Sequence, residues 1–180
     1  MPRVASIAAC LVLAAAAIPV SAQHQPYAGQ SERELKALSA EEVKQYMAGA
    51  GMGYAKPAEL NHFPGPMHVL ELADQLKLTA EQRAATRKLM DAHKAEARGL
   101  GSELVAAERE LDQLFSAGRV DEAVLARAVR TSAAIVGEYR LSHLETHRRM
   151  RALLSDEQVK RYDELRGYAS GSGGRHHQKH

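Results

Sequence analysis

Tryptophan is absent from this 180-residue chain, and aromatic residues make up only 4% of it. Alanine, leucine, glutamate, arginine and lysine dominate the middle of the sequence, a composition that favours helices and suits sheets poorly. The formal net charge is only +2, whereas a nucleic-acid-binding protein usually carries a dense basic patch. The sequence therefore predicts an all-α protein that does not bind nucleic acid.

Long hydrophobic runs are also lacking, apart from one near the start. Arg3 precedes an apolar run from Ile7 to Val20, and Ser21-Ala22 completes a small-residue cleavage site. The run is too short to span a bilayer comfortably. We therefore predict a cleavable signal peptide at residues 1–22, export to the periplasm and no stable membrane insertion. Because Cys10, the single cysteine, lies in this segment, the exported chain has no disulfide.

Three further segments follow the predicted signal peptide. Residues 23–63 read as a flexible N-terminal segment with one short helix, which begins at the capping box Ser39-Ala40-Glu41-Glu42 and ends before Gly49. Residues 64–168 have helical periodicity, and residues 169–180 form a glycine- and histidine-rich tail that we expect to be disordered.

The periodic segment predicts two long helices between two short ones. Apolar residues recur with helical spacing from Met67 to Leu76, from Thr79 to Phe115, and from Asp121 to Leu154, and a last short helix runs to Tyr168. Gly118 separates the long helices, which therefore form an antiparallel hairpin. Gly99 and Gly101 each weaken the first long helix by ~1 kcal/mol relative to Ala, so a bend is plausible there.

One short motif occurs at both corners where a short helix meets a long one. Leu78-Thr79-Ala80-Glu81-Gln82 is echoed by Leu154-Ser155-Asp156-Glu157-Gln158. In each copy the hydroxyl residue, Thr79 or Ser155, can cap the helix, and the glutamine, Gln82 or Gln158, can reach back to the capping residue. We expect these four residues to be structural helix caps.

These paired motifs, the signal peptide and the helical hairpin resemble the LTxxQ family of periplasmic proteins that includes Spy and CpxP. The resemblance covers about residues 64–168 and implies a thin, cradle-like homodimer without enzymatic activity. It implies an ATP-independent chaperone that binds unfolded or misfolded periplasmic proteins during envelope stress, with a sensor kinase as a further partner. Relatives with metal roles make heavy-metal binding or sensing the alternative function.

Client binding of this kind needs an exposed surface that mixes cationic and apolar groups. The two long helices offer such residues, and each of them taken singly is also explained as an ordinary solvated helix face. The candidates are Arg83, Arg87, Lys88, Met90, Lys94, Arg98, Arg140, Arg148, Arg149, Met150 and Arg151.

Nine histidines stand out against the scarcity of aromatic residues. His143 and His147 are four residues apart, the spacing by which one helix face presents two metal ligands. Folding the hairpin about Gly118 places His93 opposite Leu144, within one turn of both. We therefore predict a site in which His93, His143 and His147 bind zinc or nickel, although the fold requires no cofactor. The alternative is that these three histidines are ordinary helix residues that bind no common metal ion.

Overall fold

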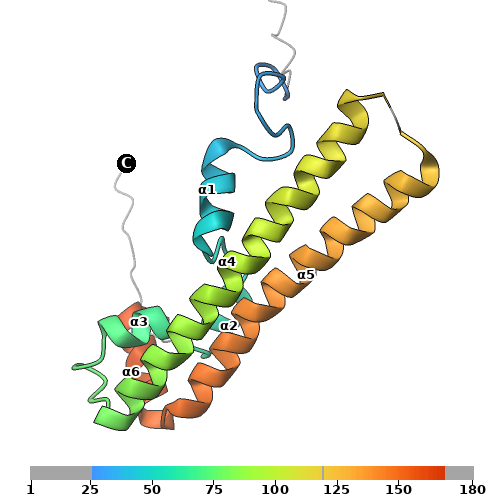
Figure 1. The fold of residues 1–180 in the computed structure, drawn as a ribbon. Coiled ribbons are helices and arrows are strands. Elements are labelled where there is room, and N and C mark those ends of the chain that lie inside the picture. Colours follow the sequence, from blue (N-terminus) through green and yellow to red (C-terminus); the bar gives the residue numbers. More distant parts are fainter. Residues whose placement is uncertain (1–25, 119, 169–180) are drawn as a thin grey trace, which may run out of the picture. The chain divides into compact units, whose positions relative to one another are not determined.

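The structure is a computed structural model that describes residues 26–118 and 120–168. Residues 26–31 belong to a separate small unit, in which the Gln30 amide donates to the Tyr27 carbonyl at 3.1 Å. The predicted signal peptide and histidine-rich tail lie outside the described residues. The larger unit, from Glu32 onward, is built entirely of helices and turns in its described part, as Figure 1 shows.

Six helices make up the described part of this larger unit. They are α1 (Ala40–Ala48), α2 (Lys56–Glu59), α3 (Pro66–Glu71), α4 (Ala80–Ser116), α5 (Glu122–Leu153) and α6 (Asp156–Arg166). The predicted all-α class is therefore confirmed. No helix among the described residues is both long enough and apolar enough to cross a bilayer.

Helices α4 and α5 form the predicted hairpin and lie side by side in Figure 1. The turn between them contains Gly118, whose φ of 62° is in the left-handed region that favours glycine. Asp121 then caps α5 by accepting from the amides of Ala123 and Val124 at 2.9 and 3.2 Å. Helix α4 continues without interruption through Gly99 and Gly101.

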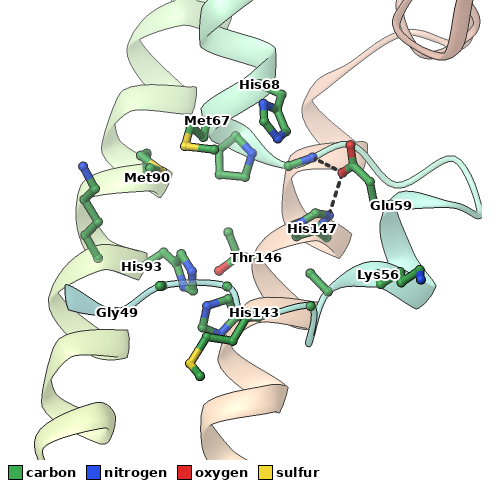
Figure 2. Close-up of a pocket in the computed structure, with 18 of the residues that line it drawn as sticks. Gly49, Lys56, Glu59, Met67, His68, Met90, His93, His143, Thr146 and His147 are labelled. Carbon is green, nitrogen blue, oxygen red and sulfur yellow. Dashed lines mark hydrogen bonds and ion pairs between the residues drawn. The ribbon is translucent and has the colours of Figure 1, made fainter. Parts of the chain in front are cut away.

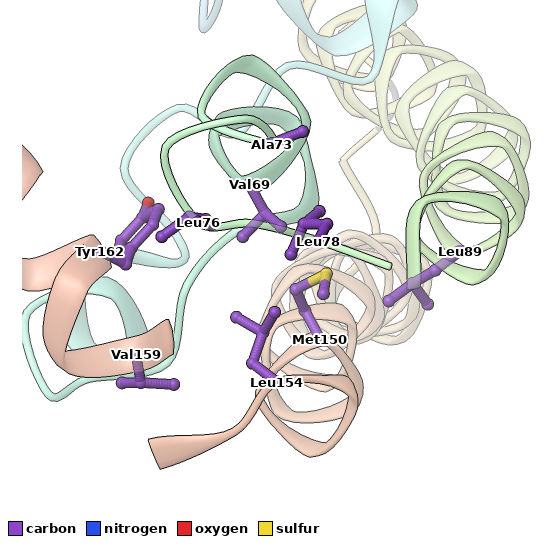
Figure 3. Close-up of a cluster of buried hydrophobic side chains, with 9 residues drawn as sticks. All are labelled: Val69, Ala73, Leu76, Leu78, Leu89, Met150, Leu154, Val159 and Tyr162. Atoms are coloured by element: carbon purple, nitrogen blue, oxygen red, sulfur yellow. The ribbon is translucent and has the colours of Figure 1, made fainter. Parts of the chain in front are cut away.

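The base of the hairpin, at the end opposite this turn, holds one of two hydrophobic cores. Helices α3 and α6 pack there against the first turns of α4 and the last turns of α5, as Figure 3 shows. The buried side chains of this core are those of Val69, Ala73, Leu76, Leu78, Leu89, Met150, Leu154, Val159 and Tyr162.

Both copies of the repeated motif form complete capping boxes at this base. The Thr79 hydroxyl accepts from the Gln82 amide at 3.1 Å, and the Thr79 amide donates back to Gln82 Oε1 at 3.1 Å. Ser155 and Gln158 make the same pair of bonds at 3.2 and 2.9 Å. The two caps begin α4 and α6, each of which follows a tight corner.

The two motif glutamines also hydrogen-bond to each other. Gln82 Nε2 donates to Gln158 Oε1 at 2.8 Å, and Gln158 Nε2 donates to Gln82 Oε1 at 2.9 Å. Each Nε2 also donates to a main-chain carbonyl in the other corner, that of Leu153 for Gln82 and that of Leu76 for Gln158. Each glutamine thus caps its own helix and joins its corner to the other one, a link that local capping rules do not predict.

The N-terminal segment packs on the hairpin through a second core. Tyr46 of α1 is only 7% exposed and packs with Ala97, Leu104, Val105 and Tyr139 from α4 and α5. The prediction of a flexible segment with one short helix is therefore wrong for residues 32–63, which form two helices and bury apolar side chains.

Gly101 makes the contact between α1 and α4 possible. A Cβ atom at this position would lie 1.9 Å from the Tyr46 carbonyl oxygen. The carbonyl of Ala50, just after α1, accepts from the Tyr139 hydroxyl at 2.6 Å. The glycine that the sequence suggested as a bend point is instead the place where the main chain of α1 lies against α4.

Candidate functional site

A cavity of about 580 Å³ lies between the hairpin and the chain segment that runs from α1 to α3. Helix α4 contributes Met90, His93 and Lys94 to its wall, and α5 contributes His143, Thr146 and His147. The opposite wall is formed by residues of 48–68, so the packed N-terminal segment is needed to enclose this space (Figure 2).

Two histidines from different helices meet in the wall of this cavity. The rings of His93 and His143 are 4.5 Å apart between centroids and nearly perpendicular, at 86° (Figure 2). His143 is 3% exposed. Its Nδ1 donates to the Tyr139 carbonyl at 2.8 Å, which fixes the tautomer and leaves a lone pair on Nε2. The pairing of His93 with this part of α5 agrees with the register predicted from the turn.

Neither imidazole has all of its polar atoms satisfied. His143 Nε2 and His93 Nδ1 are buried, and neither has a hydrogen-bond partner among the described residues. The Ala50 carbonyl lies close enough to His143 to raise its pKa, and the same carbonyl accepts from the Tyr139 hydroxyl at 2.6 Å. Buried polar atoms without partners are rare in folded proteins, so this pair needs an explanation.

Burial also keeps both rings uncharged. Desolvation, and then the nearby His143 and His147, lower the pKa of His93 to about 4. Desolvation is likewise the main cause that lowers the pKa of His143, and the Tyr139 carbonyl opposes it. Both rings are therefore neutral at neutral pH, the form in which imidazole presents a lone pair.

His147 does not join this pair. Its Nδ1 donates to the Phe63 carbonyl at 2.7 Å and lies 3.5 Å from Glu59 Oε2. No three His, Cys, Asp or Glu side chains in the described part of the chain converge as ligands for one metal ion. The predicted site of three histidines is therefore wrong as a formed ligand set, because the segment before α3 holds the third ring.

Glu59 anchors that segment to α5 and α6. It accepts hydrogen bonds from the Tyr162 hydroxyl and from the Gly65 amide, the latter at 3.1 Å. Its carboxylate also lies 3.8 Å from the Arg166 guanidinium. Nothing in the sequence pattern pointed to Glu59, because its partners Tyr162 and Arg166 lie more than a hundred residues away along the chain.

The cationic candidates for client binding fall into two groups. Three are held by neighbouring carboxylates: Arg83 by Asp74 at 2.5 Å, Arg148 by Glu145 at 2.6 Å, and Arg151 by Asp156. Six are exposed and take part in no ion pair within the described ranges, namely Arg87, Lys88, Lys94, Arg98, Arg140 and Arg149. These six are the ones free to contact a partner.

The two methionine candidates have different surroundings. Met150 is 0% exposed and belongs to the core at the base of the hairpin, so the prediction that it contacts clients is wrong. It follows Thr146 by one turn on the buried face of α5. Met90 is partly buried and lines the cavity, where its side chain remains accessible from inside.

Comparison with known protein families adds the wider context. A model of the family described as LTXXQ motif family protein matches residues 66–166. The chain belongs to the LTXXQ motif family. The match begins at the first residue of α3 and ends at the last residue of α6, and it includes both Gln82 and Gln158. No curated protein and no solved structure matches the chain.

The LTXXQ motif family includes Spy/CpxP-like proteins, is typically periplasmic and is non-enzymatic. Helices α1 and α2 precede the matched region, so Tyr46 of the second core and most of one wall of the cavity come from outside it. The cavity therefore joins the LTXXQ hairpin to a segment that the family match does not cover.

Two groups of exposed apolar side chains on this LTXXQ protein lie near the turn and at the cavity. Near the turn of the hairpin, Phe115 is 59% exposed and Val129 47%. At the cavity, the exposed residues are Leu60 at 50% and Met67 at 48%, and both line it. Val129 lies in the helical stretch from Asp121 to Leu154 that the sequence predicts, whereas nothing in the sequence pattern pointed to Leu60.

Proposed function

We propose that this LTXXQ-family protein is an exported, ATP-independent chaperone that binds unfolded or misfolded proteins in the periplasm. The signal-peptide pattern at residues 1–22 and the typical location of the family support the compartment. The sequence has no phosphate-binding loop, which agrees with a binding activity that does not use ATP.

The main support is the mixed surface at the mouth of the cavity. Exposed Leu60 and Met67 line the same cavity as Lys56 and Lys94. Apolar side chains of an unfolded client can enter the cavity, while the two ammonium groups attract acidic residues beside them. Met90 adds a flexible, polarizable wall that adapts to different side chains. Such a surface suits many sequences rather than one.

The exposed apolar residues near the turn support a second part of the proposal, a homodimer. Phe115, Val124 and Val129 lie at the end of the hairpin where no other helix of the described chain covers α4 and α5. A second copy would remove this apolar surface from water. Analytical ultracentrifugation of the protein and of its Phe115→Ser/Val129→Ser variant tests this part separately.

The chaperone proposal is tested by light scattering of a chemically denatured client with and without equimolar protein. We expect the protein to suppress aggregation and the Leu60→Ser/Met67→Ser variant to lose most of this effect. The matched control is Leu141→Ser, which changes a 55% exposed leucine on α5 that does not line the cavity. An absence of suppression by the unaltered protein would refute the chaperone function, and equal suppression by the cavity variant would refute the surface.

A further inference from the structure

Part of the cavity wall is open because it lacks a side chain. Gly51 lines the cavity, and a Cβ atom at this position would meet only His143 Cδ2, at 3.8 Å, which is an ordinary contact. The φ of Gly51 is negative, unlike that of Gly49 and Gly53, so its backbone conformation does not require glycine. A side chain at Gly51 would therefore take up cavity space without straining the backbone. The glycine leaves room for a ligand.

The cavity also carries positive charge that no carboxylate balances. Its lysine, arginine and carboxylate side chains are Lys56, Lys94, Arg166 and Glu59. The Glu59 carboxylate is already engaged, because it accepts from the Tyr162 hydroxyl and lies 3.8 Å from the Arg166 guanidinium. Lys56 and Lys94 are exposed and take part in no ion pair within the described ranges. These two ammonium groups favour an anionic ligand.

Most of the remaining lining is apolar and adaptable. Met52, Met67 and Met90 bring thioether side chains from the segment after α1, from α3 and from α4. Such side chains are flexible and adapt to an apolar body of variable shape. Met90 and Lys94 are four residues apart on α4, so an apolar and a cationic side chain share one helix face. The cavity volume of about 580 Å³ lies within the range of about 300–1,000 Å³ that is usual for small-molecule sites.

These features together fit a flexible apolar chain that ends in an anion. We propose that the cavity binds a single-chain amphiphile with an anionic head group, either a fatty acid or a lysophospholipid. The chain lies against the methionines, and the carboxylate or phosphate lies at Lys56 and Lys94.

This binding site goes beyond the proposed chaperone function and does not rest on it. Light scattering reports the effect on unfolded clients, whereas direct titration reports the amphiphile. A protein that suppresses aggregation but binds no amphiphile would disprove only the amphiphile site. A protein that binds the amphiphile but leaves aggregation unchanged would disprove only the chaperone function.

The test is isothermal titration calorimetry of the protein with sodium dodecanoate below its critical micelle concentration. We expect saturable binding of one dodecanoate per chain. Decanoate should bind roughly tenfold more weakly, because two fewer methylene groups are buried. Dodecyltrimethylammonium, which has the same chain length and a cationic head, should bind at least tenfold more weakly. A lysophosphatidylglycerol with a dodecanoyl chain distinguishes the two sources: tighter binding than dodecanoate assigns the site to a lipid, and weaker binding assigns it to a free fatty acid.

Two variants test the head group and the chain separately. Lys56→Gln/Lys94→Gln should weaken dodecanoate binding about tenfold. Its matched control is Lys88→Gln, which changes an exposed lysine of α4 outside the cavity lining and should bind as the parent does. Gly51→Leu fills the cavity and should weaken binding at least tenfold. Its control is Gly137→Leu, which changes an exposed glycine of α5 away from the cavity and should leave binding unchanged.

Four results would overturn the site: no saturable binding of dodecanoate or of the lysophospholipid, equal affinity for dodecyltrimethylammonium, unchanged affinity in the double lysine variant, or unchanged affinity in a folded Gly51→Leu protein. Circular dichroism of each variant identifies any that fails to fold. Because Lys56 and Lys94 are both exposed, the double lysine variant keeps its fold and decides the matter even if Gly51→Leu does not fold.

Discussion

Replacing Gly101 by alanine tests whether α1 is truly seated on α4. The new Cβ would lie 1.9 Å from the Tyr46 carbonyl oxygen and 2.6 Å from its carbonyl carbon. Carbon and oxygen atoms in contact are normally about 3.3 Å apart, so the main chain of α1 must move by more than an ångström. Because the clash is with backbone atoms, no rotation of a side chain relieves it.

The magnitude follows from two opposing effects. Moving α1 disrupts the packing of the buried Tyr46 ring, and the loss of a buried aromatic side chain or an overpacked core costs about 2–3 kcal/mol. Alanine instead of glycine inside a helix contributes about 1 kcal/mol in the opposite direction. We therefore expect Gly101→Ala to lower the free energy of unfolding by about 1–2 kcal/mol.

Gly99→Ala is the matched control, because a Cβ at Gly99 would meet no atom within 4 Å. The same helix-propensity gain then appears alone, and the free energy of unfolding should rise by up to about 1 kcal/mol. Urea denaturation followed by circular dichroism measures both variants. A Gly101→Ala protein as stable as the Gly99→Ala protein would refute the seating of α1, and the two glycines would then be ordinary weak points of a helix.

Three further outcomes are expected. Gln82→Ala and Gln158→Ala should each lower the free energy of unfolding, measured by urea denaturation, by about 1–2 kcal/mol. A double-mutant cycle should give a coupling energy of about 1 kcal/mol between them, and strictly additive effects of the two substitutions would contradict the reciprocal bonds. The folded-state pKa of His93, about 4, lies below the unfolded value of 6.5, so the protein loses stability as pH falls from 6.5 toward 4. Because the ring is partly exposed, we expect the free energy of unfolding to fall by about 1–2 kcal/mol. His93→Gln should reduce this loss when it is measured between pH 7.5 and 4.5. Tyr162→Phe leaves the Glu59 carboxylate without its hydroxyl donor and should cost about 1–3 kcal/mol in thermal unfolding, and an unchanged melting temperature would show that this bond contributes nothing.

The helices of the hairpin could be predicted because their signals are local. The cap at Thr79 and the break at Gly118 give α4 within one or two residues of its observed bounds, and Asp121 gives the start of α5. Helix α2 was not predicted, because it has only four residues and no side-chain cap. Its position is set by contacts such as that of Glu59 with Tyr162, which connect distant parts of the chain.

The candidate site was predictable in part for the same reason. A tight turn fixes the register of the two helices it joins, so the meeting of His93 with the neighbourhood of His143 followed from counting residues on either side. The separate partner of His147 depends on where Phe63 lies, and nothing in the sequence places an irregular segment against a helix. Burial of Met150 likewise depends on α3 and α6 covering the base.

The bonds between the two motif corners hold the hairpin more firmly at its base than at its turn. At the base, Gln82 and Gln158 tie the start of α4 to the start of α6, and this end of the hairpin also holds a hydrophobic core. Beyond the ion pair of Arg109 with Glu34, the described residues at the other end of the helices are held by the turn and by contacts between α4 and α5. Bending and fraying should therefore grow along α4 and α5 toward Phe115, and amide hydrogens near the turn should exchange fastest. A stiff base and a compliant tip let one end keep its shape while the other adjusts to whatever it touches.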